Sequence, residues 1–293
     1  MTTVEEKERP GNPCSWHCLE DHYIQAGNVR TRYWQLGDGG SPVVLLHGLG
    51  SYLNSWCLNM APLAARHRVY APDLIGHGYT DKPAVSYSLD CFVGFLQDFL
   101  DALGLGRSHL VGHSWGGAVA LRFAVLYPER VGRLVLAGSS GLGPEVSFWL
   151  RLMTLPYISF RAARLSRKAL QLISRRVISR PEKRTPEWVG MTQERLYLPG
   201  VRKVVRAVAR NHLNLFGIRS DSLQLLEDEL PRLAVPTLVI HGANDWLIPP
   251  SNTAFARSLN PRLQVKILEQ CGHELQYECA DDFNALVLDF LSE

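Results

Sequence analysis

The chain has 293 residues, of which 46% are hydrophobic and 20% are charged, and its formal net charge is +3. This length is compatible with one large α/β domain that carries an insertion, and the composition is ordinary for a soluble globular protein. No apolar run of about 18 residues predicts a membrane span, and the polar residues 1–21 contain no apolar core of a secretory signal. We therefore expect a cytoplasmic protein without a nucleic-acid partner.

Six cysteines are scattered along a chain that is too long to need disulfide staples, so we expect free thiols in a reducing compartment. They are Cys14, Cys18, Cys57, Cys91, Cys271 and Cys279. Cys14 and Cys18 bracket His17, but further ligands are missing nearby, so we expect no metal site.

A flexible tail, residues 1–21, precedes a segment in which short apolar runs alternate with helical patterns. The runs 22–26 and 29–36 flank Gly27-Asn28 and predict a β-hairpin, because Gly and Asn tolerate positive φ. Six further runs predict strands at 42–47, 69–74, 108–113, 133–138, 236–242 and 264–268. Helical spacing lies between most of them, at 89–103, 115–127 and 283–291. This alternation predicts a mostly parallel sheet covered by helices on both faces.

Residues 141–220 interrupt this alternation after the sixth strand and show an all-helical pattern. They carry sixteen basic and four acidic residues, a net charge of +12, whereas the rest of the chain has a net charge of −9. A basic insertion in an acidic body suggests a separate structural unit with its own role. We therefore divide the chain into an α/β core, residues 22–140 and 221–293, and a helical cap, residues 141–220.

The segment Gly112-His113-Ser114-Trp115-Gly116 follows a predicted strand and opens a predicted helix. This G-x-S-x-G pattern is typical of a nucleophile elbow, in which the serine sits on a tight and strained strand-to-helix turn. Glycine at both flanking positions lets the strand and the helix approach closely. The pattern alone is weak, and its place between strand and helix is what favours a catalytic serine.

A serine hydroxyl is a poor nucleophile without a base, and His273 follows the last predicted strand, where that base is expected. Asp245 follows the strand 236–242, where a buried carboxylate would hold the imidazole tautomer. Each residue alone also fits a structural role, such as a helix cap for the aspartate. Their order after Ser114, and their places at the carboxyl ends of strands, predict a catalytic triad of all three.

Two backbone N–H groups are expected to bind the oxyanion that forms when a serine attacks a carbonyl. One belongs to Trp115, directly after the serine, and the other to Leu49, in the loop after strand 42–47. We expect Gly48, Trp149 and Met153 to contact the substrate, and no metal or cofactor to be needed.

These motifs resemble those of the α/β-hydrolase-fold serine hydrolases over residues 23–291. The resemblance rests on residues 47–50, Asp73 with Gly76 and Gly78, residues 112–116, Gly242 with Asp245, and Gly272 with His273. It implies that fold, with the helical cap inserted after the sixth core strand. We expect hydrolysis of a small-molecule carboxylic ester, with an apolar or amphiphilic acyl group, through an acyl-enzyme.

Two other functions stay open on the same scaffold. Carbon–carbon bond hydrolases of the meta-cleavage type have a segment similar to residues 138–144, and a basic cap would suit a substrate carboxylate. They commonly carry Trp directly after the catalytic His, where this chain has Glu274. A non-catalytic small-molecule receptor of this fold would keep the triad, and rapid turnover of a simple ester would argue against it.

The cap is expected to form a lid over the site. Its early part is apolar and aromatic and its later part is strongly basic, which predicts a peripheral contact with an anionic membrane. In the alternative interpretation, the apolar residues roof the pocket and the basic residues cover the outside. The sequence does not predict the oligomeric state.

Overall fold

The computed structural model describes residues 19–152, 154 and 167–292. Within this part of the chain, eight strands form one sheet in the order β1-β2-β4-β3-β5-β6-β9-β10. They are β1 (His22–Ala26), β2 (Val29–Leu36), β3 (Pro42–Leu46), β4 (Arg68–Pro72), β5 (Ser108–His113), β6 (Val131–Ala137), β9 (Thr237–Gly242) and β10 (Gln264–Leu268). β2 is antiparallel to both of its neighbours, and the other adjacent pairs are parallel. The predicted, mostly parallel sheet is confirmed.

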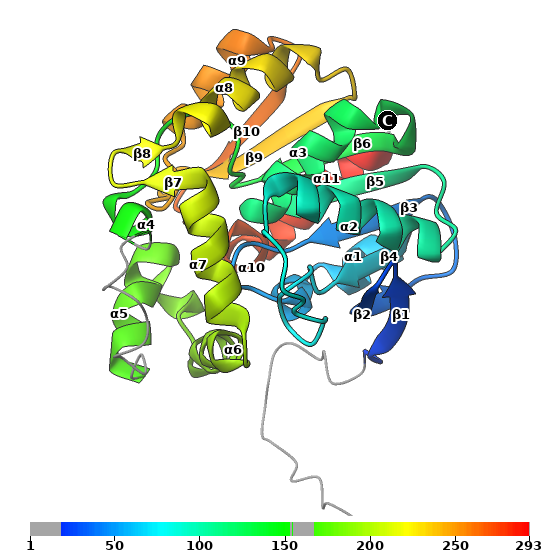
Figure 1. The fold of residues 1–293 in the computed structure, drawn as a ribbon, viewed down its shortest axis with the longest axis horizontal. Helices are drawn as coiled ribbons and strands as arrows, with labels where there is room; N and C mark the ends of the chain where they lie inside the picture. Colours follow the sequence, from blue (N-terminus) through cyan, green and yellow to red (C-terminus); the bar gives the residue numbers. More distant parts are fainter. Residues whose placement is uncertain (1–18, 153, 155–166, 293) are drawn as a thin grey trace, which may run out of the picture.

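Helices cover both faces of this sheet (Figure 1). They are α1 (Met60–Ala64), α2 (Leu89–Ala102), α3 (Trp115–Leu126), α8 (Ser220–Glu229), α9 (Ser251–Leu259), α10 (Leu275–Glu278) and α11 (Ala280–Ser292). Short 3-10 turns occur at η2 (Leu53–Trp56), η3 (Pro128–Arg130), η4 (Pro181–Lys183) and η5 (Leu230–Arg232). α2 shows how the sequence sets such a helix. The Ser88 side chain accepts a hydrogen bond from the Cys91 backbone N–H at its start, and Phe92, Phe95 and Phe99 form its buried face.

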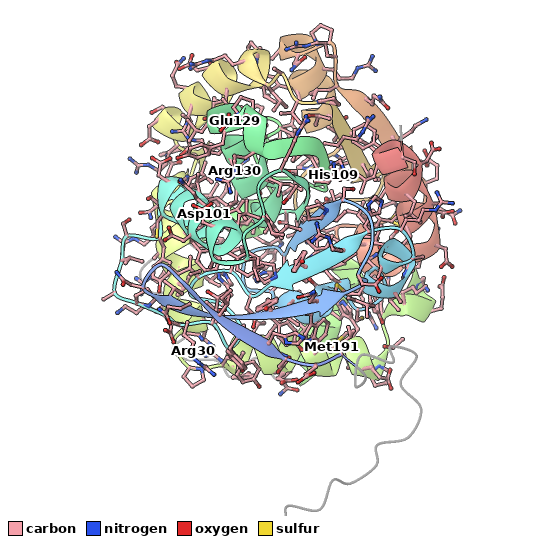
Figure 2. The ribbon with its side chains drawn as sticks, turned by 90° about the vertical axis from the view of Figure 1, so that its right-hand side faces the viewer. Arg30, Asp101, His109, Glu129, Arg130 and Met191 are labelled. Atoms are coloured by element: carbon pink, nitrogen blue, oxygen red, sulfur yellow. A yellow bond between two sulfur atoms is a disulfide. The ribbon has the colours of Figure 1, made fainter. Side chains whose placement is uncertain are left out.

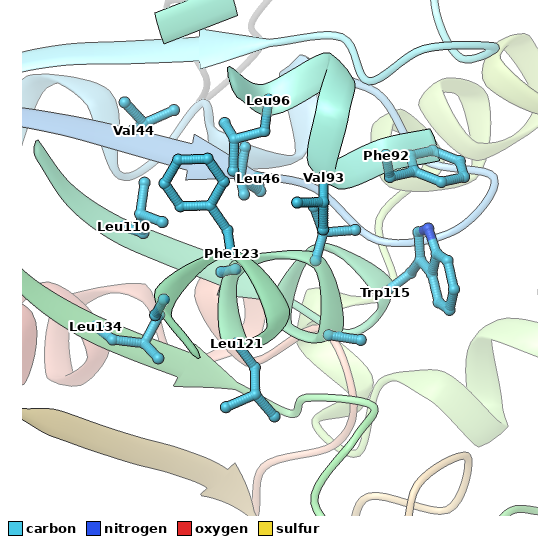
Figure 3. Close-up of a cluster of buried hydrophobic side chains, with 14 of the residues drawn as sticks. Val44, Leu46, Phe92, Val93, Leu96, Leu110, Trp115, Leu121, Phe123 and Leu134 are labelled. Atoms are coloured by element: carbon cyan, nitrogen blue, oxygen red, sulfur yellow. The ribbon is translucent and has the colours of Figure 1, made fainter. Parts of the chain in front are cut away.

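The hydrophobic core lies in two layers, one on each face of the sheet. Figure 3 shows the layer between α2, α3 and the strands, where Phe92 lies beside Trp115 and Phe123 packs near Leu96. The rings of Phe92 and Trp115 meet edge to face, with centroids 5.5 Å apart. This packing fixes the first turn of α3, which carries the residues next to the predicted nucleophile.

One surface contact fixes the strand that leads into the insertion. Figure 2 shows Arg130 and Asp101 close together, and Arg130 Nη2 lies 2.7 Å from Asp101 Oδ1. Arg130 Nε also donates to the carbonyl of Gly106 at 2.7 Å. The end of α2 is thereby joined to η3, which feeds directly into β6.

The insertion between β6 and β9 differs from its predicted all-helical form. Its helices are α4 (Phe148–Leu152), α5 (Arg167–Val177), α6 (Pro186–Tyr197) and α7 (Val201–His212), and a two-stranded antiparallel ribbon follows, β7 (Leu213–Asn214) with β8 (Gly217–Ile218). The ribbon forms because Asn214 Oδ1 accepts a hydrogen bond from the Phe216 N–H and Gly217 adopts a φ of 137°. Two residues per strand are too few to show periodicity in a sequence.

The expectation of free thiols is wrong for two of the cysteines. Cys271 and Cys279 form a disulfide, with Cα atoms 6.5 Å apart, because the loop after β10 turns back into α10. Neither Cys57 nor Cys91 forms a disulfide with another described cysteine, and Cys14 and Cys18 lie outside the described residues. None of the helices that the structure describes is long and apolar enough to span a membrane.

Candidate active site

Ser114 stands between β5 and α3 with a strained backbone. Its φ is +52° and its ψ is −116°, a conformation that costs free energy for any residue with a Cβ. Its N–H donates to the carbonyl of Ala137 in β6 at 3.0 Å, and its carbonyl accepts from Ser140 N–H at 3.0 Å. The turn is therefore held by the neighbouring strand, and it presents the serine side chain at the carboxyl edge of the sheet.

The two glycines of the elbow are required by close backbone contacts. A Cβ placed on Gly112 would lie 2.4 Å from the carbonyl oxygen of Gly116, so the strand would press into the helix. A Cβ on Gly116 would lie 2.3 Å from the Leu46 carbonyl oxygen in β3. The steric reason that the sequence suggested for glycine at these positions is confirmed.

We expect Gly116→Ala to lower the free energy of unfolding by about 1–3 kcal/mol, because α3 would have to move away from β3. A matched control is Gly94→Ala in α2, where a Cβ meets no atom within 4 Å. That change should stabilise the protein by about 0.5–1 kcal/mol, because alanine is the better helix former. Urea unfolding curves measure both. Equal effects of the two substitutions would show that the elbow tolerates a side chain.

The structure brings the three predicted triad side chains together in one chain of hydrogen bonds. His273 Nε2 lies 3.0 Å from Ser114 Oγ, and His273 Nδ1 lies 2.7 Å from Asp245 Oδ2. Asp245 follows β9 and His273 follows β10, as the strand order requires. These distances are within the range that a serine, its base and the orienting carboxylate need.

Asp245 is held in one orientation and stays ionised. Its Oδ1 accepts hydrogen bonds from the backbone N–H groups of Leu247 at 2.9 Å and Ile248 at 3.0 Å, which leaves Oδ2 for the imidazole. Burial alone would raise the pKa of Asp245, but attraction to His273 and a contact with His241 bring it below its ordinary value. An ionised carboxylate in this place can stabilise an imidazolium.

The imidazole of His273 carries a raised pKa although it is buried. Burial alone would lower the pKa, and the charge and hydrogen bond of Asp245 outweigh that effect. The backbone N–H of His273 donates to the Val177 carbonyl at 2.8 Å, and its own carbonyl contacts His113 Nε2 at 2.9 Å. Burial lowers the pKa of His113 to about 4, so this neighbour is neutral and supports the loop.

A buried ion pair that the sequence did not indicate lies beside the triad. Arg195 in α6 places its Nη2 3.5 Å from Glu274 Oε1, and its Nη1 donates to Ser51 Oγ at 3.0 Å. Glu274 also accepts from Gln276 Nε2 at 2.9 Å. Burial would raise the pKa of Glu274, but Arg195 lowers it below its ordinary value, so the carboxylate is charged next to His273. The pair connects the insertion to the loop that carries the base.

We expect kcat/KM to rise with pH and to level off above the pKa of His273, because a protonated imidazole cannot accept the serine proton. Glu274→Gln removes a negative charge near His273 and leaves Arg195 in place, so the pKa falls and the acid limb moves to lower pH. Arg195→Gln removes the opposing positive charge and should move the limb to higher pH. The measurement is the pH profile of kcat/KM with an uncharged substrate. Acid limbs that stay unmoved in both variants would contradict this coupling.

The predicted oxyanion donors have no acceptor within the described protein. Neither the Leu49 nor the Trp115 N–H has a hydrogen-bond partner among the residues that the structure describes, which leaves both available to a substrate oxygen. Gly48 borders the same space, because a Cβ there would lie 3.1 Å from Ser114 Cβ and 3.1 Å from His113 Nδ1. On the side of Gly48, the reaction centre is therefore bordered by backbone atoms and by no side chain of that residue.

A cavity of about 140 Å³ opens above Ser114 between the core and the insertion. Most of its wall is apolar: Leu49, Leu89, Trp115, Ala118, Leu121, Val146, Leu150, Val208, Ala209, Leu213, Ile218, Leu225, Leu226 and Ile248 contribute to it. The Trp115 ring also contacts the ring of His212 from α7, with centroids 4.8 Å apart. Sequence reasoning missed the contribution of α7, α8, β7 and β8, because no motif marks those positions.

The predicted substrate contacts in α4 need correction. Trp149 is 60% exposed, and among the described residues it is Leu150 rather than Trp149 that lines the cavity from this helix. Successive helical residues point about 100° apart, so a shift of one position changes the face entirely. Met153 lies outside the described residues.

Comparisons with known proteins agree with this arrangement. The family model described as "alpha/beta hydrolase fold" matches residues 41–280. A 2-hydroxymuconate semialdehyde hydrolase of a Pseudomonas species is 33% identical and covers 92% of this chain and 93% of its own. The structure of a meta-cleavage product hydrolase from Pseudomonas fluorescens is 28% identical, with a TM-score of 0.78, and covers 92% of this chain and 97% of its own. A membrane phospholipase A described as a bacterial virulence factor is 28% identical, with a TM-score of 0.74, and covers 94% and 86%.

The names of the meta-cleavage product hydrolases among the relatives fit the carbon–carbon alternative better than the ester hydrolysis that the sequence suggested first, whereas the phospholipase A is named for a different substrate class. The relatives have in common that they are hydrolytic enzymes built on this scaffold. The extent of the family match and the identity of these relatives place the chain: it belongs to the α/β-hydrolase fold family of hydrolases.

Proposed function

We propose that this protein is a serine hydrolase in which Ser114 is the nucleophile, His273 the base and Asp245 the residue that orients it. The observation that carries the proposal is the continuous hydrogen-bond chain from Ser114 Oγ through the imidazole to the Asp245 carboxylate. The strained backbone of Ser114, beneath a largely apolar cavity, supports it.

The reaction begins when Ser114 Oγ adds to a carbonyl carbon while His273 takes the hydroxyl proton. The negative charge that develops on the carbonyl oxygen is stabilised by the N–H groups of Leu49 and Trp115. His273 then delivers the proton to the leaving group, which departs with the electrons of the broken bond. Water, activated by the same imidazole, releases the acid and restores the serine.

We infer that the bond cleaved is a carbon–carbon bond next to a carbonyl group, because several relatives are named as meta-cleavage product hydrolases or as hydrolases of 2-hydroxy-6-oxo-dienoates. The leaving group would then be a carbanion stabilised as an enolate, and it would take the proton from His273 on carbon. Conjugation with a second carbonyl makes such a leaving group accessible, so the substrate class is a vinylogous diketone acid.

Ester hydrolysis is the second candidate, and the cavity favours it. Among the described residues, neither Lys nor Arg lines the cavity, whereas Glu145 and Glu229 do. Arg195 is a cation beside the triad in the described part of the chain, and Glu274 compensates its charge. Among the described residues, an anionic substrate would meet no unpaired positive charge in this cavity, and an uncharged ester with an apolar acyl group would fit without one.

The deciding experiment compares kcat/KM for a 2-hydroxy-6-oxo-dienoate with kcat/KM for a series of p-nitrophenyl esters of increasing acyl length. Faster cleavage of the dienoate supports the carbon–carbon reaction. Turnover of the esters alone overturns it and supports the second candidate, and a preference for acetyl over medium-chain esters would speak against an apolar acyl site. Turnover of neither class, with a fluorophosphonate probe that leaves Ser114 unlabelled, would overturn the hydrolase proposal.

A further inference from the structure

The loop that carries His273 is held by the core on one side and by the insertion on the other. On the core side, the backbone N–H of Asn244 donates to the carbonyl of Cys271 at 2.9 Å, and His113 Nε2 contacts the carbonyl of His273 at 2.9 Å. On the other side, the backbone N–H of His273 donates to the carbonyl of Val177, the last residue of α5, at 2.8 Å. The backbone of the proposed base is therefore bonded directly to the insertion.

A buried carboxylate strengthens the same contact. Glu278, the last residue of α10, is fully buried, and each of its two carboxylate oxygens accepts a hydrogen bond from the backbone. Oε2 accepts from the N–H of Gly272, directly before His273, at 2.7 Å, and Oε1 accepts from the N–H of Arg180 at 2.5 Å. One side chain thus bridges the loop of the base and residues 177–180 of the insertion, which we call the α5–η4 segment.

The carboxylate of Glu278 is matched to these backbone groups. Burial raises the pKa of Glu278, and hydrogen bonds from the N–H groups of Arg180, Gly272 and Ser179 act in the opposite direction. An ionised carboxylate accepts such bonds more strongly than a neutral amide oxygen does. The contact is also tight, because a Cβ on Gly272 would lie 2.4 Å from the carbonyl oxygen of Val177. The loop of the base and the α5–η4 segment therefore have little room to shift against each other.

The disulfide also closes the loop of the base, but it ties that loop to the residue after α10 and does not reach the insertion. We propose that Glu278 is a positioning residue, whose carboxylate keeps the His273 imidazole in line with Ser114 by tying the loop of the base to the α5–η4 segment. This inference rests on the proposed triad, because it concerns how the base of that triad is held. The insertion then contributes to catalysis through the base as well as through the cavity wall.

The test measures how fast an alkyl fluorophosphonate labels Ser114, a reaction that needs the base but does not depend on which bond the enzyme cleaves. Glu278→Gln keeps one acceptor oxygen and turns an NH₂ group toward the other backbone N–H, so one of the two contacts is lost. The maximal labelling rate should fall about tenfold to a hundredfold, because small misplacements of a catalytic group are costly. The probe concentration for half-maximal rate should change little, since Glu278 is not part of the described cavity wall.

The insertion side of the contact is tested at Arg180. Arg180→Pro removes the backbone N–H that Glu278 accepts, and the φ of −76° at this position suits proline. The matched control is Arg180→Ala, which keeps the N–H. Both variants lose the hydrogen bond from Arg180 Nε to the Gln270 carbonyl, so their difference reports the backbone contact alone. Arg180→Pro should slow labelling as Glu278→Gln does, Arg180→Ala should label like the parent, and the double variant should lose less than the product of the single losses.

Melting curves establish that the variants fold, and one measurement needs no variant. In the parent, the amides of Gly272 and Arg180 should be protected from hydrogen exchange, although neither lies in a helix or strand. Exposed amides, labelling of folded Glu278→Gln at the parent rate, or equal losses in the two Arg180 variants would overturn the inference. A parent protein that the probe does not label at Ser114 would overturn the proposed function instead.

Discussion

Ser114→Ala is expected to reduce kcat by on the order of a millionfold while leaving the fold intact. The Oγ atom that it removes lies 3.0 Å from His273 Nε2 and is the atom proposed to attack the carbonyl. The strained backbone of Ser114 is held by hydrogen bonds of its own N–H and carbonyl, which an alanine keeps. The loss should therefore appear in kcat on the substrate that the parent enzyme cleaves, and the melting temperature should change little.

A matched control for this variant is Ser108→Ala, at the other end of β5. Ser108 is buried, and its Oγ has no hydrogen-bond partner within the described residues, so its removal should leave kcat near that of the parent. A fluorophosphonate probe should label the parent and the control and spare Ser114→Ala. If Ser114→Ala stayed within tenfold of the parent, or the probe modified a different residue, the nucleophile would be misassigned.

The sequence was most informative where residues of a catalytic type follow predicted strands in a defined order. Three residue types, each unremarkable alone, followed three predicted strands, and parallel strands bring their carboxyl ends to one edge of the sheet. The backbone then had to place Ser114, Asp245 and His273 near one another, and it does so within hydrogen-bond distance. The glycines at 112 and 116 could also be interpreted from the sequence, because close backbone contacts at these positions allow no residue other than glycine.

What the sequence did not reveal depends on how the insertion packs. Arg195 and Glu274 are 79 residues apart and meet only because α6 lies against the loop after β10. Leu150 rather than Trp149 faces the cavity, since a short helix of five residues gives too little periodicity to orient its faces. The pairing of Cys271 with Cys279 likewise depends on the geometry of a turn. The amino-acid composition of the chain does not indicate that geometry.

Asp245→Asn is expected to lower kcat about ten-thousandfold, and the structure gives the reason in terms of single atoms. Oδ1 of Asp245 accepts from the Leu247 and Ile248 N–H groups, so an asparagine must keep its carbonyl oxygen there. Its amide NH₂ then faces His273 Nδ1, where the carboxylate oxygen lies 2.7 Å away in the parent. A donor in that place favours the tautomer with the proton on Nε2, which cannot accept the proton of Ser114.

The same reasoning predicts what the variant retains. Its two backbone hydrogen bonds persist, so the loop after β9 should stay folded, and circular dichroism with a melting curve checks this. Glu269→Gln is the matched control, because Glu269 lies exposed in the loop before His273 and its amide should leave kcat unchanged. Full activity of a folded Asp245→Asn variant would mean that another carboxylate orients the base. Glu274, buried directly after His273, would be the first to test, since it already lies within reach of the imidazole's electrostatic field.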